Sequence, residues 1–340
     1  MPTTERTRAS SRRRRTRVAV TTVVVLSVVA LVGLPMIVLG EDSGAVTPWS
    51  TDEASAPVAP VPSDAPTTYS PADPSDTGTA PPAGGVPSAP RLDMSADAPG
   101  SASTADTASP SGEAAPVGDL PGWRQIFVDD FDTPVARGSF PGPYADSWLP
   151  YDGFTDTNDN GTYRAGAISV ADGMLSLGVS ALGDEVTSSA VVPLVDGQWG
   201  GQTHGRYSVR LRADPVEGYS AAFLLWSDEN DWDDGEIDFP EGHLDKEVRA
   251  YNHKLGDPSE NSFDRRTAVP FSEWHTYTIE WGPDEIAFQI DGVTIGTTRS
   301  DIPTAKMHWV MQIETLKSAP PDGAQGAVHI DWATIYRYDG

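Results

Sequence analysis

Alternation of apolar and polar residues, interrupted by short turn signals, is the feature that most constrains how this chain can fold. Residues 207–211 alternate in this way, and residues 277–281 repeat the pattern. Asp172-Gly173 and Asp291-Gly292 each separate two such runs, and a two-residue Asp-Gly loop is typical of a β-hairpin. No long stretch shows helical periodicity. We therefore expect an all-β domain built as a sandwich of two antiparallel sheets.

One predicted strand carries acids where a buried strand would carry apolar residues. Residues 235–242 read Gly-Glu-Ile-Asp-Phe-Pro-Glu-Gly. In a strand alternate side chains share a face, so Glu236 and Asp238 point the same way. Ile237 and Phe239 alternate with them, which is the pattern of a strand with one packed face and one open face.

The third acid, Glu241, joins the other two only if the strand contains one extra residue. Plain alternation would turn it to the opposite face, whereas a β-bulge restores it to the first. Pro240 suits this interpretation, because proline lacks an N–H and is tolerated in strands mainly at bulges and edges. The sequence therefore predicts three carboxyl groups on one face.

Three neighbouring carboxyl groups repel one another, so the pKa of at least one of them should be raised. A protonated carboxyl group beside an ionised one is the pair that cleavage of a glycosidic bond requires. The alternative is a solvated acidic turn, which is how we interpret the acids of residues 228–234 just upstream.

Charge is distributed unevenly along the chain. The sequence has 340 residues and no cysteine, so it uses neither disulfides nor thiol chemistry. Seven of its 23 basic residues lie before residue 18, and beyond that point 16 basic and 48 acidic residues remain, a formal charge of −32. Such a surface repels nucleic acid and polyanions and favours a neutral partner, here a neutral polysaccharide such as a glucan.

The N-terminal 119 residues form three segments of different composition. Residues 1–17 are strongly basic, and residues 18–40 are almost wholly apolar and long enough to span a bilayer with the arginines on the cytoplasmic side. We expect a membrane anchor, with a cleaved signal peptide as the alternative, and an exported remainder in both cases. Residues 41–119 are rich in Pro, Ala, Ser, Thr and Asp, which predicts a disordered linker.

Three segments in order carry a family resemblance. They are Gly205-Arg206-Tyr207-Ser208-Val209-Arg210, Ala222-Phe223-Leu224-Leu225-Trp226 and the acidic motif, and together they resemble glycoside hydrolase family 16 over residues 120–340. The bulged motif looks like the laminarinase-like branch, and Phe-Pro-Glu-Gly looks like secreted actinobacterial members. The resemblance implies a concanavalin-like β-jelly roll whose concave sheet forms a substrate cleft.

By position, the resemblance makes Glu236 the nucleophile and Glu241 the acid/base, with Asp238 between them tuning both pKa values. It implies a retaining endo-glycosidase that hydrolyses β-1,3 or mixed β-1,3/1,4 glucans by double displacement, acting as a monomer. Two departures put the sugar subsites in doubt: Ser208 stands where related members often have Glu, and Asp233 follows Trp232 where they tend to have Pro.

Further side chains are candidates for sugar contacts, with core or rim positions as the alternative. They are Trp226, Trp232, Trp199, Arg206, His253, Gln312 and Glu314. No cofactor is required, but family members often hold a structural calcium ion, and Asp331 matches its ligand by position. A single carboxylate is weak support for calcium, which takes six to eight oxygen ligands.

Two other functions remain open on the same sequence. One is a non-catalytic glucan-binding module on the same fold, although such a module has no use for a protonated Glu beside a carboxylate. The other is a transglycosylase that remodels the envelope, which an anchor and a linker would suit. The length of the products would separate transfer from hydrolysis.

Overall fold

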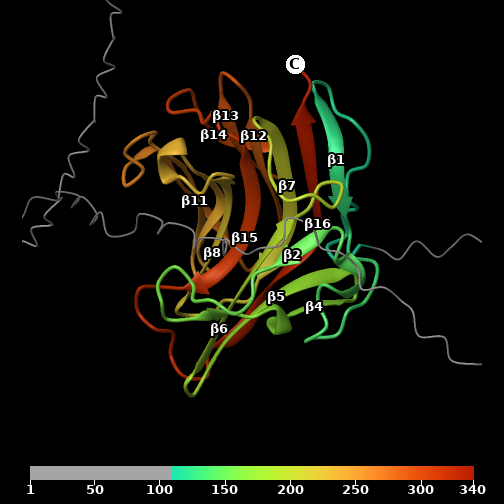
Figure 1. Cartoon of the computed structure of the whole chain (residues 1–340), viewed down its shortest axis with the longest axis vertical. Helices are drawn as coiled ribbons and strands as arrows, with labels where there is room; N and C mark the ends of the chain where they lie inside the picture. Colours follow the sequence, from blue (N-terminus) through green and yellow to red (C-terminus); the bar gives the residue numbers. More distant parts are fainter. Residues whose placement is uncertain (1–108) are drawn as a thin grey trace, which may run out of the picture. The chain divides into compact units, whose positions relative to one another are not determined.

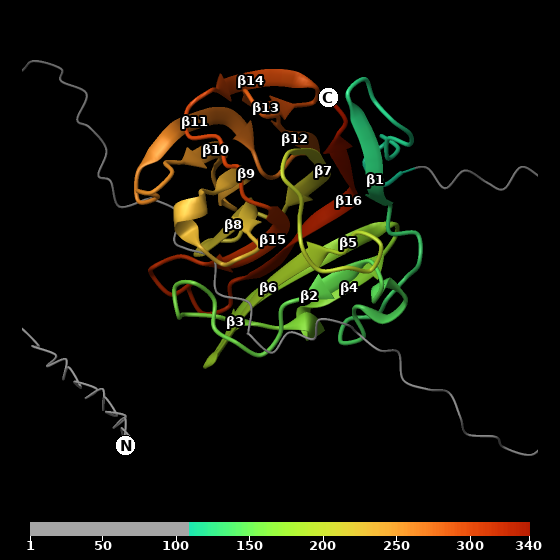
Figure 2. The same ribbon diagram turned by 45° about the horizontal axis from the view of Figure 1, so that its top comes forward.

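The computed structural model describes residues 109–340, which form two packed β-sheets joined at one strand (Figures 1 and 2). Within these residues the structure contains 16 strands and three short 3₁₀ helices. The prediction of an all-β sandwich is confirmed. The predicted segments 1–17 and 18–40, and the linker up to residue 108, lie outside the described residues. Across the described part of the chain, no helix is long and apolar enough to cross a membrane.

The sheet that carries the acidic motif, here called the acid sheet, has the strand order β11-β10-β9-β8-β15-β6, with β2 paired to β6 (Figure 2). The strands are β11 (Asn261–Pro270), β10 (Glu247–His253), β9 (Ile237–His243), β8 (Tyr219–Ser227), β15 (Met307–Thr315), β6 (Glu185–Pro193) and β2 (Trp148–Pro150).

The opposite sheet continues from β6 through β5-β16-β7-β12-β13-β14, while β4 pairs with β5, β1 with β16 and β3 with β6. Its strands are β5 (Met174–Leu182), β16 (Gln325–Tyr338), β7 (Gly205–Ala213), β12 (His275–Trp281), β13 (Ile286–Ile290), β14 (Val293–Thr298), β4 (Ile168–Ala171), β1 (Trp123–Asp129) and β3 (Thr162–Tyr163). The 3₁₀ helices are η1 (Gly142–Tyr144), η2 (Ala165–Ala167) and η3 (Trp232–Asp234).

Both predicted hairpins form where the Asp-Gly pairs stand. Asp172 and Gly173 connect β4 to β5 with φ angles of 53° and 73°, and Asp291 and Gly292 connect β13 to β14 with 49° and 74°. Positive φ at both central residues is the type I′ geometry, whose twist matches that of the flanking strands. The local sequence therefore sets the register of both hairpins.

The main core lies between the sheets and is built from alternate residues of each strand. Phe239 of β9 is typical: it is 1% exposed, and its ring centroid lies 5.5 Å from that of Tyr277 and 5.6 Å from that of Phe288, both on the opposite sheet. Because β9 turns Ile237 and Phe239 into this core, the residues between them face the other side of the acid sheet.

The chain before the first strand packs against β16. The Asp331 carboxylate accepts hydrogen bonds from the Ser109 and Ser111 hydroxyls, and the Arg210 guanidinium lies 2.8 Å from the Glu113 carboxylate. Trp332 Nε1 donates to the Glu113 carbonyl at 2.9 Å. The predicted linker runs to residue 119, whereas these contacts with the sheet begin at Ser109.

Candidate active site

The three acids of the motif lie on one face of the acid sheet, as alternation with one β-bulge predicts. Glu236 and Asp238 are 1% and 0% exposed, and Glu241 is half-buried. Glu236 precedes the first residue of β9, where Gly235 adopts a φ of 95°. A side chain at Gly235 would approach Leu255 and Pro303, so glycine is needed at this turn.

The β-bulge is present at the predicted place. Along β9 the register passes from Asp238, opposite Leu224, to Glu241, opposite Ala222. The chain therefore advances by three residues on β9 while it advances by two on β8, so β9 contains one extra residue, as a β-bulge requires. The Phe239-Pro240 peptide bond is cis. The extra residue brings Glu241 back to the face of Asp238, so the prediction of three clustered acids is confirmed.

His253 completes the cluster from the neighbouring strand β10. Its amide donates to the Glu236 carbonyl at 3.0 Å, which places the two residues side by side. Its Nε2 lies 3.2 Å from Asp238 Oδ2 and 4.0 Å from Glu236 Oε2, and its Nδ1 contacts the Pro258 carbonyl at 2.6 Å. The imidazole is fully buried, and the contact of Nδ1 with the Pro258 carbonyl directs Nε2 toward the acids.

Burial and repulsion shift the protonation of this cluster. Burial raises the pKa of Glu236 well above its ordinary value, and repulsion from Asp238 and Glu241 adds to the effect, against a smaller opposing contribution from the Trp232 indole. Burial alone would lower the pKa of His253, but the adjoining Asp238 carboxylate outweighs it and the pKa is raised. The site therefore retains protons that the same groups would release in water.

Three of the predicted sugar-binding residues are tryptophans, and all three lie on the face that carries the acids. Trp226 of β8 is 3% exposed, and its Nε1 donates to Asn230 Oδ1 at 3.0 Å. Trp232 of η3 is half-buried, with its ring 5.9 Å from that of His253. Trp199 is half-buried and belongs to the same aromatic and aliphatic cluster as Trp226.

Gln312 and Glu314 of β15 point to this face but are covered. They are 1% and 5% exposed. Gln312 Nε2 donates to Glu314 Oε1 at 2.6 Å, while the Thr157 amide and the Tyr163 hydroxyl donate to Glu314 Oε2 at 2.9 and 3.1 Å. Burial raises the pKa of Glu314 to about 7, against the hydrogen bonds from Thr157 that lower it. Glu314 therefore holds the segment that contains Thr157 and Tyr163 against β15.

Arg206 does not join the site, and the expectation that it faces the cleft is wrong. It belongs to β7 of the opposite sheet, where Tyr207 takes the core side and Arg206 takes the outer side. Its Nε lies 3.0 Å from Glu280 Oε1 and its guanidinium lies over the Tyr336 ring. The sheet to which a strand belongs is fixed by its long-range pairing, which the alternation within the strand does not specify.

Asp228 and His308 are a polar pair on this face that the sequence did not single out. His308 Nδ1 lies 2.9 Å from Asp228 Oδ1, and the Gly201 amide donates to both Asp228 oxygens. Asp228 was expected to lie in a solvated acidic turn. Its carboxylate instead contacts a histidine that lies 80 positions later in the sequence, so the expectation is wrong for this residue. No local pattern signals such a pair.

Two places among the described residues carry groups that are possible metal ligands. Donor atoms of Glu236, Asp238 and His253 all lie within 4.8 Å of one another. At the predicted calcium position, Asp331 is one carboxylate surrounded by two serine hydroxyls, and Arg210 Nε donates to Ser111. These groups supply fewer oxygens than calcium prefers, beside a guanidinium that repels it. Calcium at Asp331 stays a prediction.

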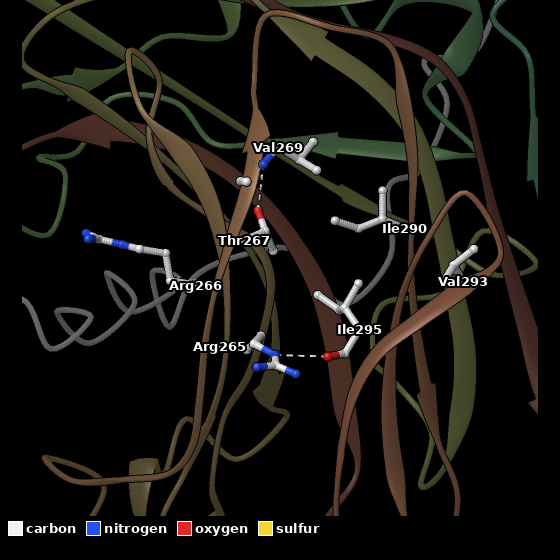
Figure 3. A pocket seen from close by; sticks show the side chains of 8 residues that line it. Arg265, Arg266, Thr267, Val269, Ile290, Val293 and Ile295 are labelled. Atoms are coloured by element: carbon white, nitrogen blue, oxygen red, sulfur yellow. Dashed lines mark hydrogen bonds between the residues drawn. The ribbon is translucent and has the colours of Figure 1, made fainter.

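A surface pocket of about 400 Å³ lies away from the acids, between β11 and the β13–β14 hairpin (Figure 3). Arg265 Nε donates to the Ile295 carbonyl across it at 2.9 Å, and Val293 at its rim is 67% exposed. None of the acids or tryptophans described above lines this pocket. It therefore has no part in the chemistry of the acid cluster.

Comparison with known proteins gives matches in sequence and in fold. The family model described as glycosyl hydrolases family 16 matches residues 198–334. A beta-glucanase of Rhodothermus marinus is 31% identical over 123 residues, which is 32% of this chain and 41% of that protein. A beta-glucanase of Brevibacillus brevis is 26% identical over 139 residues, 40% of this chain and 53% of that protein. The chain thus spans about half or less of the length of these relatives.

Solved structures with the same fold include a laminarinase from Flavobacterium sp. UMI-01, at 18% identity and a TM-score of 0.53, covering 63% of this chain and 100% of that one. An endo-beta-1,3-glucanase from Pyrococcus furiosus gives 17% identity and a TM-score of 0.51, covering 65% and 97%. At these identities the likeness shows the fold alone.

Proposed function

Residues 198–334 belong to glycosyl hydrolases family 16, and on that premise we propose that this chain is a retaining endo-β-glucanase acting on β-1,3 or mixed β-1,3/1,4 glucans. The observation that carries the proposal is the β-bulge, which brings Glu241 to the face of Glu236 and Asp238. The beta-glucanase names of the relatives, and the negative charge of the chain, support a neutral glucan as substrate.

The proposed reaction has two displacements. Glu241 donates a proton to the leaving oxygen while ionised Glu236 attacks the anomeric carbon and forms a glycosyl-enzyme. Glu241, now ionised, then takes a proton from water, which releases the sugar with retained configuration. His253 holds Asp238 at 3.2 Å, and Asp238 in turn adjusts the protonation of Glu236. Burial of Glu236 keeps water from competing with the sugar at the nucleophile.

The test compares three forms of the full chain on laminarin, mixed-linkage β-glucan and agarose, with new reducing ends as the measurement. We expect the wild type to cleave the two glucans and Glu236→Gln to fall below detection. Glu280→Gln, which removes a half-buried glutamate from the opposite sheet, is the matched control and should keep its activity. Equal rates for wild type and Glu236→Gln would refute the assignment of the nucleophile.

The same assay separates the rival functions. Retention of glucan by the wild type without any new reducing ends would favour a binding module. Products longer than the substrate would favour a transglycosylase. Retention of configuration is tested separately by following the anomer that is released first with NMR.

We propose in addition that the domain works outside the membrane, exported behind the apolar segment 18–40. The basic residues before it and the polar linker after it support this arrangement. N-terminal sequencing of the mature protein tests this arrangement. A terminus beyond residue 40 would show that the apolar segment is cleaved, and the protein would then be secreted and not anchored.

A further inference from the structure

Arg249 is a cationic side chain on the acid-bearing face that the proposed reaction does not use. It lies on β10, where Val248 and Ala250 enter the core between the sheets, so Arg249 points to the face of the acids. In the pairing of β10 with β9 it stands directly opposite Glu241. Residues opposite each other in an antiparallel pair have Cβ atoms about 4.5–5.5 Å apart, so Arg249 is the immediate neighbour of Glu241 on β10.

Two contacts fix the guanidinium group of Arg249. Its Nη2 donates to both carboxylate oxygens of Asp264 on β11, at 3.0 and 3.2 Å. The group also lies over the Tyr251 ring, 4.8 Å from the ring centroid. Tyr251 is 3% exposed and the Arg249 side chain is 18% exposed. A charge that is held in one place and partly shielded from water acts on its neighbours more strongly than a mobile surface charge.

The charged and titratable groups that face Glu241 come from the acidic motif and from two neighbouring strands. They are Glu236 and Asp238 of the motif, Arg249 and His253 of β10, and Asp264 and Arg266 of β11. β8, on the other side of β9, carries no charged residue. Arg249 is the cation directly opposite Glu241, whereas Arg266 lies one strand further away. Arg249 is therefore placed to offset the repulsion that the other two acids exert on Glu241.

Arg249 stands between a cation and a carboxyl group in one row across the acid sheet, where β11, β10 and β9 are neighbours (Figure 2). Arg266 is opposite it on one side and Glu241 on the other. Like charges directly opposite each other destabilise a sheet, so two neighbouring arginines require carboxylates close by. Asp264 is one of these carboxylates, and ionised Glu241 is the second. The row is therefore more stable when Glu241 is ionised than when it is protonated.

The proposed reaction requires Glu241 to lose its proton as the glycosidic bond breaks. The proton passes to the glycosidic oxygen, the bond from that oxygen to the anomeric carbon breaks, and Glu241 keeps the electron pair. Negative charge thus develops on a carboxyl group that already has Asp238 as a neighbour on the same face. A fixed cation stabilises this charge while it forms, which makes Glu241 a stronger acid.

We propose that Arg249 is a positioning residue that acts through Glu241: held by Asp264 and Tyr251, it stabilises the carboxylate that Glu241 becomes as it protonates the leaving oxygen. The inference rests on the proposed function, because it takes Glu241 as the acid. Arg249 therefore matters where the leaving group needs a proton. It does not matter where the leaving group departs as a stable anion.

The experiment compares two leaving groups in the full chain. The value of kcat/KM is measured on laminarin, whose leaving sugar needs a proton, and on dinitrophenyl β-laminaribioside, whose phenolate leaves without one. We expect Arg249→Met to lose about tenfold on laminarin and to keep its activity on the dinitrophenyl substrate. Arg249→Gln, which also removes the charge, should show the same selective loss. Arg249→Lys, which keeps the charge, should recover most of the activity on laminarin.

Arg206→Met is the matched control. Arg206 also pairs with a carboxylate, that of Glu280, and lies over the ring of Tyr336, and its side chain is 16% exposed, but it belongs to the opposite sheet. This variant should keep its activity on both substrates.

The ratio of the two activities distinguishes proton transfer from a role in packing or sugar binding. An equal loss on both substrates, or unchanged activity of Arg249→Met and Arg249→Gln on laminarin, would overturn the inference. Thermal unfolding shows which variants are folded, and the Gln variant decides the question if the Met variant is not. Failure of the proposed function is seen separately, because the wild type would then cleave neither substrate.

Discussion

Glu314 offers a quantitative test of how burial controls the stability of this domain. Its side chain is 5% exposed, and its pKa is raised from 4.5 to about 7. The folded state therefore holds a proton that the unfolded chain releases near pH 4.5, so the free energy of unfolding must fall as the pH rises through this interval. A rise from 4.5 to about 7 corresponds to about 3 kcal/mol.

Most of this loss develops between pH 5 and pH 8. With these two pKa values, Glu314 makes the domain less stable by about 1 kcal/mol at pH 5 and about 3 kcal/mol at pH 8, relative to a residue that does not ionise. Glu314→Gln removes the ionisation. The difference in unfolding free energy, variant minus wild type, should therefore increase by about 2 kcal/mol from pH 5 to pH 8.

The assay is urea unfolding of both proteins at the two pH values, followed by tryptophan fluorescence. Gln also disturbs the hydrogen bonds from Thr157 and Tyr163, but that cost is present at both pH values and cancels in the comparison. Glu273→Gln, at a site whose side chain is 70% exposed, controls for the loss of one charge. A difference that stays the same at pH 5 and pH 8 would refute the link between the burial of Glu314 and its pKa.

The remaining predictions concern the acid cluster and the N-terminal contacts. Burial raises the pKa of Glu236, so kcat/KM should fall at low pH, as Glu236 becomes protonated, with a midpoint above pH 4.5. A pH–rate profile whose acidic midpoint lies at or below pH 4.5 would contradict this. For the same reason Glu236→Gln should unfold at a higher temperature than wild type at pH 8, with a smaller difference at pH 5, and calorimetric scans that show no gain at pH 8 would argue against it. Ser111→Ala should lower the melting temperature by a few degrees, because it removes the hydroxyl that donates to Asp331 and accepts from Arg210. A chelator that leaves the melting temperature of the wild type unchanged would end the calcium hypothesis.

The acid cluster was predictable because it depends on the period of a single strand. Alternation placed Glu236 and Asp238 together, and Pro240 marked the bulge that brings Glu241 to them. The neighbouring strand was harder to assign, and the resemblance rather than any period identified His253. The sequence predicted a raised pKa for at least one of the three acids through their repulsion, and the structure gives it to Glu236 with burial, a tertiary property, as the largest cause.

The contact of the predicted residues with sugar stays a prediction, and the structure shows only which of them lie on the face of the acids. Trp226 and Trp232 flank the acidic motif and lie at the site. Arg206 carries an equally suggestive sequence but faces outward from the opposite sheet. Glu314 faces the correct side, yet a segment more than 150 residues earlier in the chain covers it and turns a candidate sugar ligand into an anchor.

The sequence by itself determined the strands, the two Asp-Gly hairpins, the bulge and the identity of the three acids, because each is a property of a few adjacent residues. Only the tertiary structure decided which sheet each strand joins, which polar groups are buried and which distant residues meet. The pair of Asp228 and His308 shows why: it joins residues 80 positions apart, and its geometry exists only once β15 has paired with β8.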